Sequence, residues 1–176
     1  RSAIFMSNHQ SNFDIPVFYS GLPAQFRWLA KAELFKIPIF GRGMRGAGYI
    51  SIDRSDRRSA MASLARAATA IRNGASVLIF PEGTRTADGR LRDFKSGGFI
   101  LAVDAGVPIV PMAVYGTFDI MPRGSLLIRR RPVHIAFGPA IDAAAYTRAT
   151  KNQLMDDVRD AIQRILDQLK AGQDRG

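Results

Sequence analysis

Short apolar runs alternate along the chain with stretches in which apolar side chains recur at helical spacing. The runs predict strands because they are rich in β-branched or aromatic residues, or alternate with polar positions. The run at 76–80 is continuously apolar, which is typical of a strand covered on both faces. The predicted strands are residues 3–6, 27–30, 49–53, 76–80, 108–114, 126–128 and 133–137.

Four segments between or after these runs predict helices. The first begins at Asp14, a candidate N-cap with a proline near the first turn. Residues 97–106 form the third, and the last starts near Thr150, which with Gln153 suits a capping box. The second helix ends at Asn73-Gly74. The apolar faces are Met61, Leu64, Ala65, Ala68 and Ile71 in the second helix, and Leu154, Val158, Ile162, Ile165 and Leu169 in the last.

This alternation of strands and helices predicts an α/β fold with a mainly parallel sheet flanked by helices. The length of 176 residues suits one domain, residues 1–176, with a single core. In such sheets, ligands gather outside the carboxyl ends of the strands. The segments that follow strands there are 7–14 ("SNHQSNFD"), 53–58 ("DRSDRR") and 81–86 ("PEGTRT"), so we expect them to lie along one edge.

Composition excludes several kinds of chemistry. The chain has no cysteine, which removes disulfides, thiolate zinc sites and a cysteine nucleophile. Its two histidines, His9 and His134, are far apart, so a zinc site would need mostly carboxylates, and we predict no metal site.

The formal net charge of +10 predicts attraction to a polyanion, which can be a nucleic acid, an anionic membrane or a phosphorylated substrate. No apolar run approaches the ~20 residues of a membrane span, and no signal peptide is visible. The first residue is Arg1 rather than a start methionine, and a strand-like run begins at Ala3. We therefore expect a membrane-associated segment to precede this chain in the native protein.

His9 and Asp14 lie on either side of a predicted strand-to-helix turn, which is short enough to bring their side chains together. In one interpretation His9 is a general base and Asp14 orients its ring. In the other, Asp14 only caps a helix and His9 is a polar loop residue.

Three other segments carry cations at the predicted active edge. In 80–86 ("FPEGTRT"), Gly83 allows close approach to the backbone and Arg85 suits a phosphate. Arg54 and Lys31 each follow a strand as further candidate phosphate ligands. The competing interpretation for each is an ordinary solvated charge.

Two segments remain ambiguous from the residues alone. Residues 33–46 ("ELFKIPIFGRGMRG") interleave apolar and basic side chains, which suits a membrane interface, an acyl-chain entrance or core packing with a basic rim. Pro108 and Pro111 are unusual in a central strand, and we interpret them mainly as structural. His134 is interpreted as structural too.

Together, "NHQSNFD", "GYISIDR", "FPEGTRT" and "VPIVPMAV", in this order, closely resemble the four sequence blocks of the glycerolipid acyltransferase family. Its best-known members are the 1-acyl-sn-glycerol-3-phosphate, or lysophosphatidic acid, acyltransferases. The resemblance covers about residues 7–114 and includes "KAELFKIPIFG" between the first two blocks. It implies a fold like that of glycerol-3-phosphate acyltransferase.

The resemblance also implies an activity and a set of site residues. The reaction is transfer of an acyl group from acyl-CoA or acyl carrier protein to the sn-2 hydroxyl of lysophosphatidic acid, without a cofactor. His9 and Asp14 are the implied catalytic residues. The implied phosphate-binding residues are Lys31, Arg54, Glu82, Gly83 and Arg85, and Val110 and Pro111 of the fourth block are assigned to the acyl-donor pocket.

From these residues we expect direct transfer without an acyl-enzyme, with backbone amides near Gly83 stabilising the oxyanion. The expected partners are a lysophospholipid, the acyl donor and an anionic membrane, at whose cytoplasmic face the protein would lie, and no nucleic acid. Two alternatives stay open. The acceptor can be glycerol 3-phosphate, another lysophospholipid or an aminolipid. The chain can instead be a basic nucleic-acid-binding domain, although it lacks a recognition helix, a zinc pattern and RNP-like aromatics.

Overall fold

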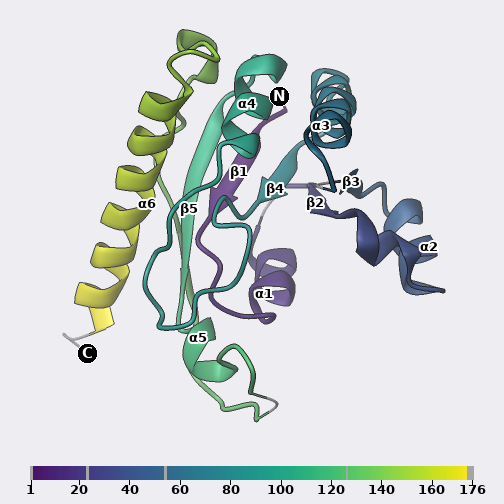
Figure 1. Ribbon diagram of the computed structural model, residues 1–176. Coiled ribbons are helices and arrows are strands. Elements are labelled where there is room, and N and C mark those ends of the chain that lie inside the picture. The colour runs from purple at the N-terminus through teal and green to yellow at the C-terminus, as the bar shows by residue number, and fades with distance from the viewer. Residues whose placement is uncertain (1, 23, 54, 126, 174–176) are drawn as a thin grey trace.

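The computed structural model describes residues 2–22, 24–53, 55–125 and 127–173, and these form one six-stranded sheet with helices on both faces (Figure 1). The strand order is β3-β2-β4-β1-β5-β6. All neighbouring strands are parallel except β6, which runs antiparallel to β5. The strands are β1 (Ile4–Ser7), β2 (Arg27–Lys31), β3 (Ile50–Ile52), β4 (Val77–Ile79), β5 (Ile109–Tyr115) and β6 (His134–Phe137).

Helices connect and cover these strands. The α-helices are α1 (Asp14–Gly21), α2 (Phe40–Gly46), α3 (Arg57–Arg72), α4 (Gly97–Ala105), α5 (Thr117–Ile120) and α6 (Lys151–Gln173). Two short 3-10 helices are η1 (Ala32–Lys36) and η2 (Ala143–Ala145). Figure 1 shows α6 running along β5, while η1 and α2 project from the side of the molecule that carries β2 and β3.

The core consists of two apolar layers, one on each face of the sheet. The larger layer joins α3, α4 and α6 to one face, and the smaller joins α1 to the other. β4 shows how the sequence produces both layers: Val77 and Ile79 belong to the larger layer and Leu78 to the smaller. Its uninterrupted apolar run therefore indicated a strand buried on both faces, as the structure confirms.

The predicted α/β fold is confirmed, and the exceptions are local. Leu127 and Ile128 lie outside regular structure and are exposed, so the strand predicted at 126–128 is wrong there, and residue 126 lies outside the described residues. Ala65 is exposed, whereas Ala67 belongs to the buried face of α3. β5 tolerates Pro111 because its pairing with β6 begins one residue later, at Met112.

Two predicted helix caps are also wrong. Phe13, not Asp14, is the N-cap of α1. Before α6, the reciprocal hydrogen bonds of a capping box join Thr147 to Thr150 rather than Thr150 to Gln153. The Thr147 N–H donates to the Thr150 hydroxyl at 2.9 Å, and the Thr150 N–H donates to the Thr147 hydroxyl at 3.3 Å.

Because β1 to β5 are parallel, their carboxyl ends meet at one edge of the sheet. His9 and Glu82 follow β1 and β4, and Lys31 is the last residue of β2, so all three lie at this edge. Among the described residues, no helix is both long and apolar enough to cross a bilayer.

Candidate active site

His9 and Asp14 form a hydrogen-bonded pair immediately after β1. The imidazole Nδ1 lies 2.7 Å from the Asp14 carboxylate Oδ2. The His9 side chain keeps 16% of its surface exposed, while the Asp14 side chain is fully buried. Because an ionised carboxylate can only accept, Nδ1 carries the proton and Nε2 is the ring nitrogen left to accept one from a substrate.

The buried Asp14 carboxylate is satisfied by several donors. The backbone N–H groups of Gln10 and Ser11 donate to Oδ2 at 2.7 and 3.0 Å, and the Thr117 hydroxyl donates to Oδ1 at 2.6 Å. These donors replace the water that a buried anion loses. They also explain why Asp14 does not cap α1: its side chain turns back toward the loop that holds His9.

Aromatic packing fixes the plane of the His9 ring. Phe80, which follows β4, stacks on the imidazole with a centroid distance of 3.8 Å and an interplanar angle of 9°. Trp28 of β2 stacks on Phe80 in turn, at 5.4 Å. The ring is therefore held by Asp14 at its edge and by Phe80 on one face, which leaves it few orientations.

Glu82 binds the loop that carries His9. One carboxylate oxygen accepts from the His9 backbone N–H at 2.7 Å, and the other accepts from the Arg92 N–H at 2.9 Å. The Thr86 N–H donates to the His9 carbonyl at 2.8 Å, which adds a second link between the two loops. Only 2% of Glu82 is exposed. The structure thus places Glu82 as a support for His9 rather than as a group that faces a phosphate, which its negative charge would repel.

The buried position of Glu82 predicts a pH effect on stability. Burial raises its pKa from 4.5 to about 7, against the opposing effect of the two backbone donors, and the nearby Asp14 charge adds to the rise while Arg92 opposes it. Between these values the native state binds more protons than the unfolded state, so the free energy of unfolding falls as the pH rises from 4.5 to 7. Above pH 7 this contribution is constant.

Glu82→Gln has no titrating carboxyl at this position, so it is the reference against which the wild-type protein is compared. Urea unfolding of both proteins at several pH values gives the difference in their free energies of unfolding. We expect the wild-type protein to lose stability relative to Glu82→Gln as the pH rises through this window. A difference that does not change with pH would show that Glu82 titrates alike in the folded and unfolded chains.

Two adjoining cavities lie at this edge of the sheet. The first, of about 380 Å³, is lined by His9 and mostly by apolar side chains such as Ile15, Leu34 and Phe40. The second, of about 550 Å³, is polar and is lined by Lys31, Glu33, Ser55, Gly83, Thr84 and Lys95. Lys31 and Gly83 line both cavities, so the apolar cavity that contains His9 adjoins the polar one.

The other predicted phosphate ligands are Gly83, Arg85 and Arg54. Gly83 adopts φ +71°, a conformation that favours glycine, and its N–H donates to the Phe80 carbonyl at 3.0 Å. That amide is therefore engaged, so the expectation that backbone amides near Gly83 stabilise the oxyanion falls on neighbouring amides and stays a prediction. Arg85 is half-buried in the same loop but does not line either cavity in the described residues. Arg54 lies outside the described residues.

Val110 and Pro111 lie inside β5, away from the cavity beside His9. Pro111 is buried, pairs with Met6 of β1, and its carbonyl accepts from the Gly138 N–H at 2.8 Å. The described lining of the apolar cavity comes from other segments. These contacts agree with the structural interpretation of Pro111, and the assignment of both residues to a donor pocket stays a prediction.

Sequence reasoning missed three contributors to the site. Thr117 begins the segment after β5, so the rule applied to the other strand ends would have selected it as well. Phe80 belongs to the "FPEGTRT" motif, whose glutamate, glycine and arginine suggested phosphate binding, and nothing in that pattern indicates stacking on His9. Lys95 precedes α4 and lines the polar cavity with Lys31, and only the folded chain brings these two lysines together.

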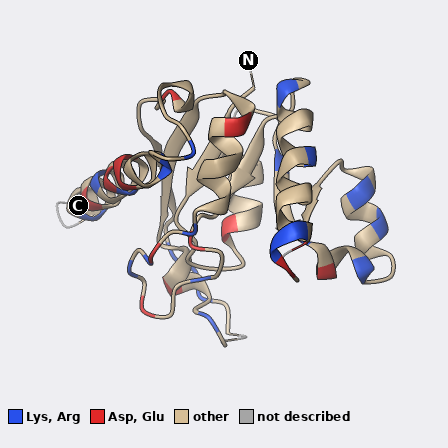
Figure 2. Cartoon of the chain, turned by 45° about the horizontal axis from the view of Figure 1, so that its top comes forward, with Lys and Arg blue, Asp and Glu red and all other residues tan. Residues whose placement is uncertain are grey.

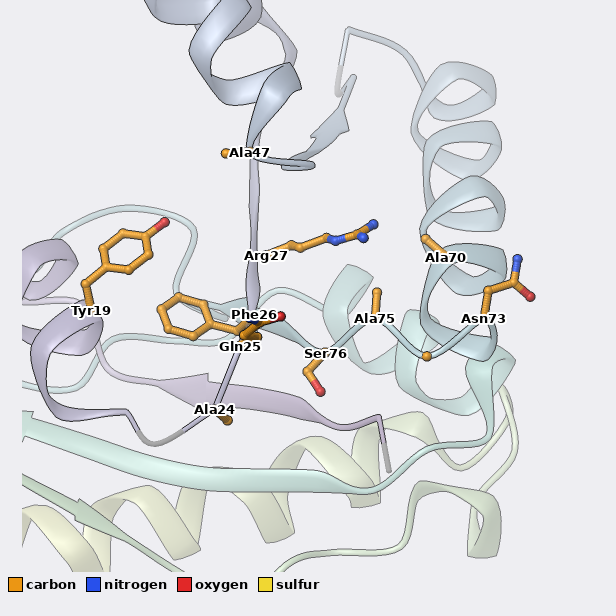
Figure 3. Close-up of a pocket in the computed structure, with 11 residues that line it drawn as sticks. Tyr19, Ala24, Gln25, Phe26, Arg27, Ala47, Ala70, Asn73, Ala75 and Ser76 are labelled. Carbon is orange, nitrogen blue, oxygen red and sulfur yellow. The ribbon is translucent and has the colours of Figure 1, made fainter.

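A cavity of about 780 Å³ lies at the opposite edge of the sheet (Figure 3). It is bordered by residues that precede β2 and β4, including Phe26 and Ser76, and by Asn73 after α3. Arg27 is its charged lining residue. Its described lining holds no histidine or carboxylate, so His9 remains the candidate general base.

The family model described as Acyltransferase matches residues 1–115. One similar protein is a chloroplast 1-acyl-sn-glycerol-3-phosphate acyltransferase of Brassica napus, 43% identical over 122 residues, or 69% of this chain and 35% of the relative. Another is the 1-acyl-sn-glycerol-3-phosphate acyltransferase of Borreliella burgdorferi, 32% identical over 169 residues, or 96% of this chain and 68% of the relative.

A similar solved structure is that of PlsC, the 1-acyl-sn-glycerophosphate acyltransferase of Thermotoga maritima. It superimposes with a TM-score of 0.82 at 31% identity, covering 97% of this chain and 67% of that one. The chain spans about a third of the length of the Brassica relative and about two thirds of the Borreliella relative. From the match over residues 1–115 and these similarities, we conclude that the chain belongs to the acyltransferase family.

Proposed function

We propose that the chain is the catalytic part of a 1-acyl-sn-glycerol-3-phosphate acyltransferase, which acylates the sn-2 hydroxyl of lysophosphatidic acid and yields phosphatidic acid. The observation that carries the proposal is the His9–Asp14 pair, with His9 in an apolar cavity that adjoins a cavity lined by two lysines. A lysophosphatidic acid has the matching parts, since its hydroxyl lies between an acyl chain and a phosphate.

The reaction follows from the orientation of the imidazole. His9 Nε2 takes the proton of the acceptor hydroxyl while the oxygen attacks the thioester carbonyl, and Asp14 stabilises the imidazolium that forms. The tetrahedral intermediate then collapses, the carbon–sulfur bond breaks, and the departing thiolate receives the proton from His9. The donor is an acyl thioester of CoA or of acyl carrier protein, and no cofactor takes part.

Positioning the acceptor falls to the polar cavity. Lys31 and Lys95 both line it and are both exposed, so their ammonium groups are available to the phosphate. Holding the phosphate fixes the hydroxyl relative to His9, which converts binding energy into orientation. Arg85 and Arg54 are further phosphate ligands in this proposal, on the basis of their motifs.

Release of free thiol from acyl-CoA across a panel of acceptors tests the proposal. The panel contains lysophosphatidic acid, glycerol 3-phosphate, a neutral lysophospholipid, an aminolipid and no acceptor, and acyl carrier protein replaces CoA in a parallel series. We expect thiol release with lysophosphatidic acid well above the other reactions. Equal release with a neutral lysophospholipid would contradict the proposed acceptor, and release with no acceptor would indicate hydrolysis.

Lys31→Met tests the phosphate contact. A charged hydrogen bond contributes about 1.5–3 kcal/mol, so we expect the KM for lysophosphatidic acid to rise by about 10- to 100-fold with a smaller change in kcat. Lys170→Met, on α6, removes the same charge far from the cavity and is the control. Steady-state kinetics in which both variants match the wild type would exclude Lys31 as a phosphate ligand.

A further inference from the structure

The segment formed by η1 and α2 exposes an unusual group of large apolar side chains. Ile39 is 83% exposed, Phe40 54%, Ile37 47% and Leu34 38%. We call these four residues the apolar lip. Soluble proteins expose single apolar side chains routinely, but an adjacent group rimmed by polar residues marks an interaction surface.

The backbone of the lip is strained at one residue. Ile39 has φ +66°, the one positive φ found at a non-glycine residue in the described parts of the chain, and a β-branched residue pays a steric cost there. A strained residue of this kind is a pointer to function when the surroundings impose it. At Ile39 this strained backbone carries an apolar side chain that is 83% exposed to water.

Close packing makes the lip a fixed part of the fold. A Cβ at Gly41 would lie 2.1 Å from the Phe35 carbonyl oxygen, so only glycine allows α2 to approach η1 this closely. The Arg45 guanidinium donates to the same carbonyl at 2.8 Å. The lip is therefore held in position by η1 and α2 together.

Basic residues surround the lip. Lys36, Arg42 and Arg45 are all exposed in this segment, against one acidic residue, Glu33, and the exposed Lys31 directly precedes the segment. Figure 2 shows the basic positions along α2 at the periphery of the molecule. Apolar side chains rimmed by cations match the boundary of an anionic bilayer, where the apolar groups enter the acyl region and the cations bind the headgroups.

The lip also borders the candidate active site. Leu34 and Phe40 line the apolar cavity that contains His9, and the lip residues Ile37 and Ile39 extend outward from it. We propose that the lip docks on an anionic lipid bilayer and opens the apolar cavity toward it. The inference rests on the proposed function, because a lysophospholipid acceptor resides in a bilayer and would enter the cavity along this route.

A fluorescent reporter tests the docking surface directly. The chain has no cysteine, so Ile39→Cys and Phe137→Cys each give a single labelling position. Phe137 is the control because it is 45% exposed, on β6, outside the lip. With vesicles of phosphatidylglycerol and phosphatidylcholine, we expect an environment-sensitive label at 39 to shift to the blue and to be quenched by brominated acyl chains, and a label at 137 to change little.

A sedimentation assay measures how much the lip contributes. Ile37→Ser/Ile39→Ser changes the two lip residues that do not line the cavity, and Phe137→Ser is its control. We expect the double variant to partition onto the anionic vesicles at least about tenfold more weakly than the wild type, and Phe137→Ser to partition normally. Thermal unfolding of each variant checks that the fold is retained.

Neither assay requires turnover, so the docking proposal and the proposed function can be refuted independently of each other. A label at 39 that responds no more than one at 137, or a double variant that sediments like the wild type, would overturn the proposal. So would a concentration-dependent dimer that the double variant abolishes while its vesicle binding is normal, because the lip would then contact a second copy of the chain. Thiol release with a dispersed short-chain acceptor reports on the proposed function alone.

Discussion

His9→Ala is expected to reduce acyl transfer by about 10²- to 10⁴-fold, because it removes the group that we propose deprotonates the acceptor hydroxyl. The ring is positioned for that step by Asp14 at its Nδ1 edge and by Phe80 on its face. The His9 backbone makes the contacts to Glu82 and Thr86, and alanine retains them. The loss should therefore fall on kcat, with the KM for lysophosphatidic acid little changed.

His134→Ala is the matched control for that variant. It is the second of the two histidines, it lies exposed on β6, and the same substitution there should leave both kinetic constants unchanged. Measurement of thiol release under saturating donor distinguishes the two variants. His9→Ala with more than about a tenth of wild-type kcat would show that another group or a water accepts the proton.

Asp14→Asn is expected to cause a second large loss, and to destabilise the protein as well. In the comparable aspartate of a serine protease triad, the asparagine variant loses about 10⁴-fold in kcat because the imidazole adopts the wrong tautomer. At Asp14, three donors converge on Oδ2 and one on Oδ1. An amide nitrogen can accept none of these, so the asparagine oxygen must face the three N–H donors while the Thr117 hydroxyl turns to accept from the amide. The N–H groups then bond a neutral oxygen instead of a carboxylate, and we expect a loss of about 1–3 kcal/mol.

Kinetics and urea unfolding should therefore both respond to Asp14→Asn. Asp160→Asn, on the exposed side of α6, is the control and should change neither measurement. Thr117→Val removes only the donor to Oδ1, and we expect it to have an intermediate effect. An Asp14→Asn protein with normal stability and normal kcat would show that the carboxylate neither orients His9 nor organises its loop.

The sheet was predictable because its strands carry strong local patterns. The short apolar run of β4 and the long periodic face of α6 indicate a strand and a helix, and the parallel order then places the carboxyl ends of β1 to β5 on one edge. The 126–128 segment was not predictable in this way, since three apolar residues among arginines are equally compatible with an exposed loop. What decides such a segment is whether a neighbouring strand is available to pair with it.

The sequence predicted which residues form the site better than it predicted what each residue does there. Spacing alone suggested that His9 and Asp14 meet, and they do. Whether Asp14 caps α1 or accepts from Gln10 and Ser11 depends on the turn geometry, which the sequence does not encode locally. Glu82 is the clearest case: its motif suggested a ligand contact, whereas both of its oxygens accept backbone N–H groups from loops far apart in sequence.

The most direct test of direct transfer from a thioester to a lysophosphatidic acid is the mass balance of one reaction. The chain is incubated with acyl-CoA and 1-acyl lysophosphatidic acid, and mass spectrometry counts phosphatidic acid and the intact protein while thiol is titrated. We predict one phosphatidic acid for each thiol and an unmodified protein, also when the acceptor is left out. Thiol without phosphatidic acid, or a protein heavier by one acyl group, would contradict the account.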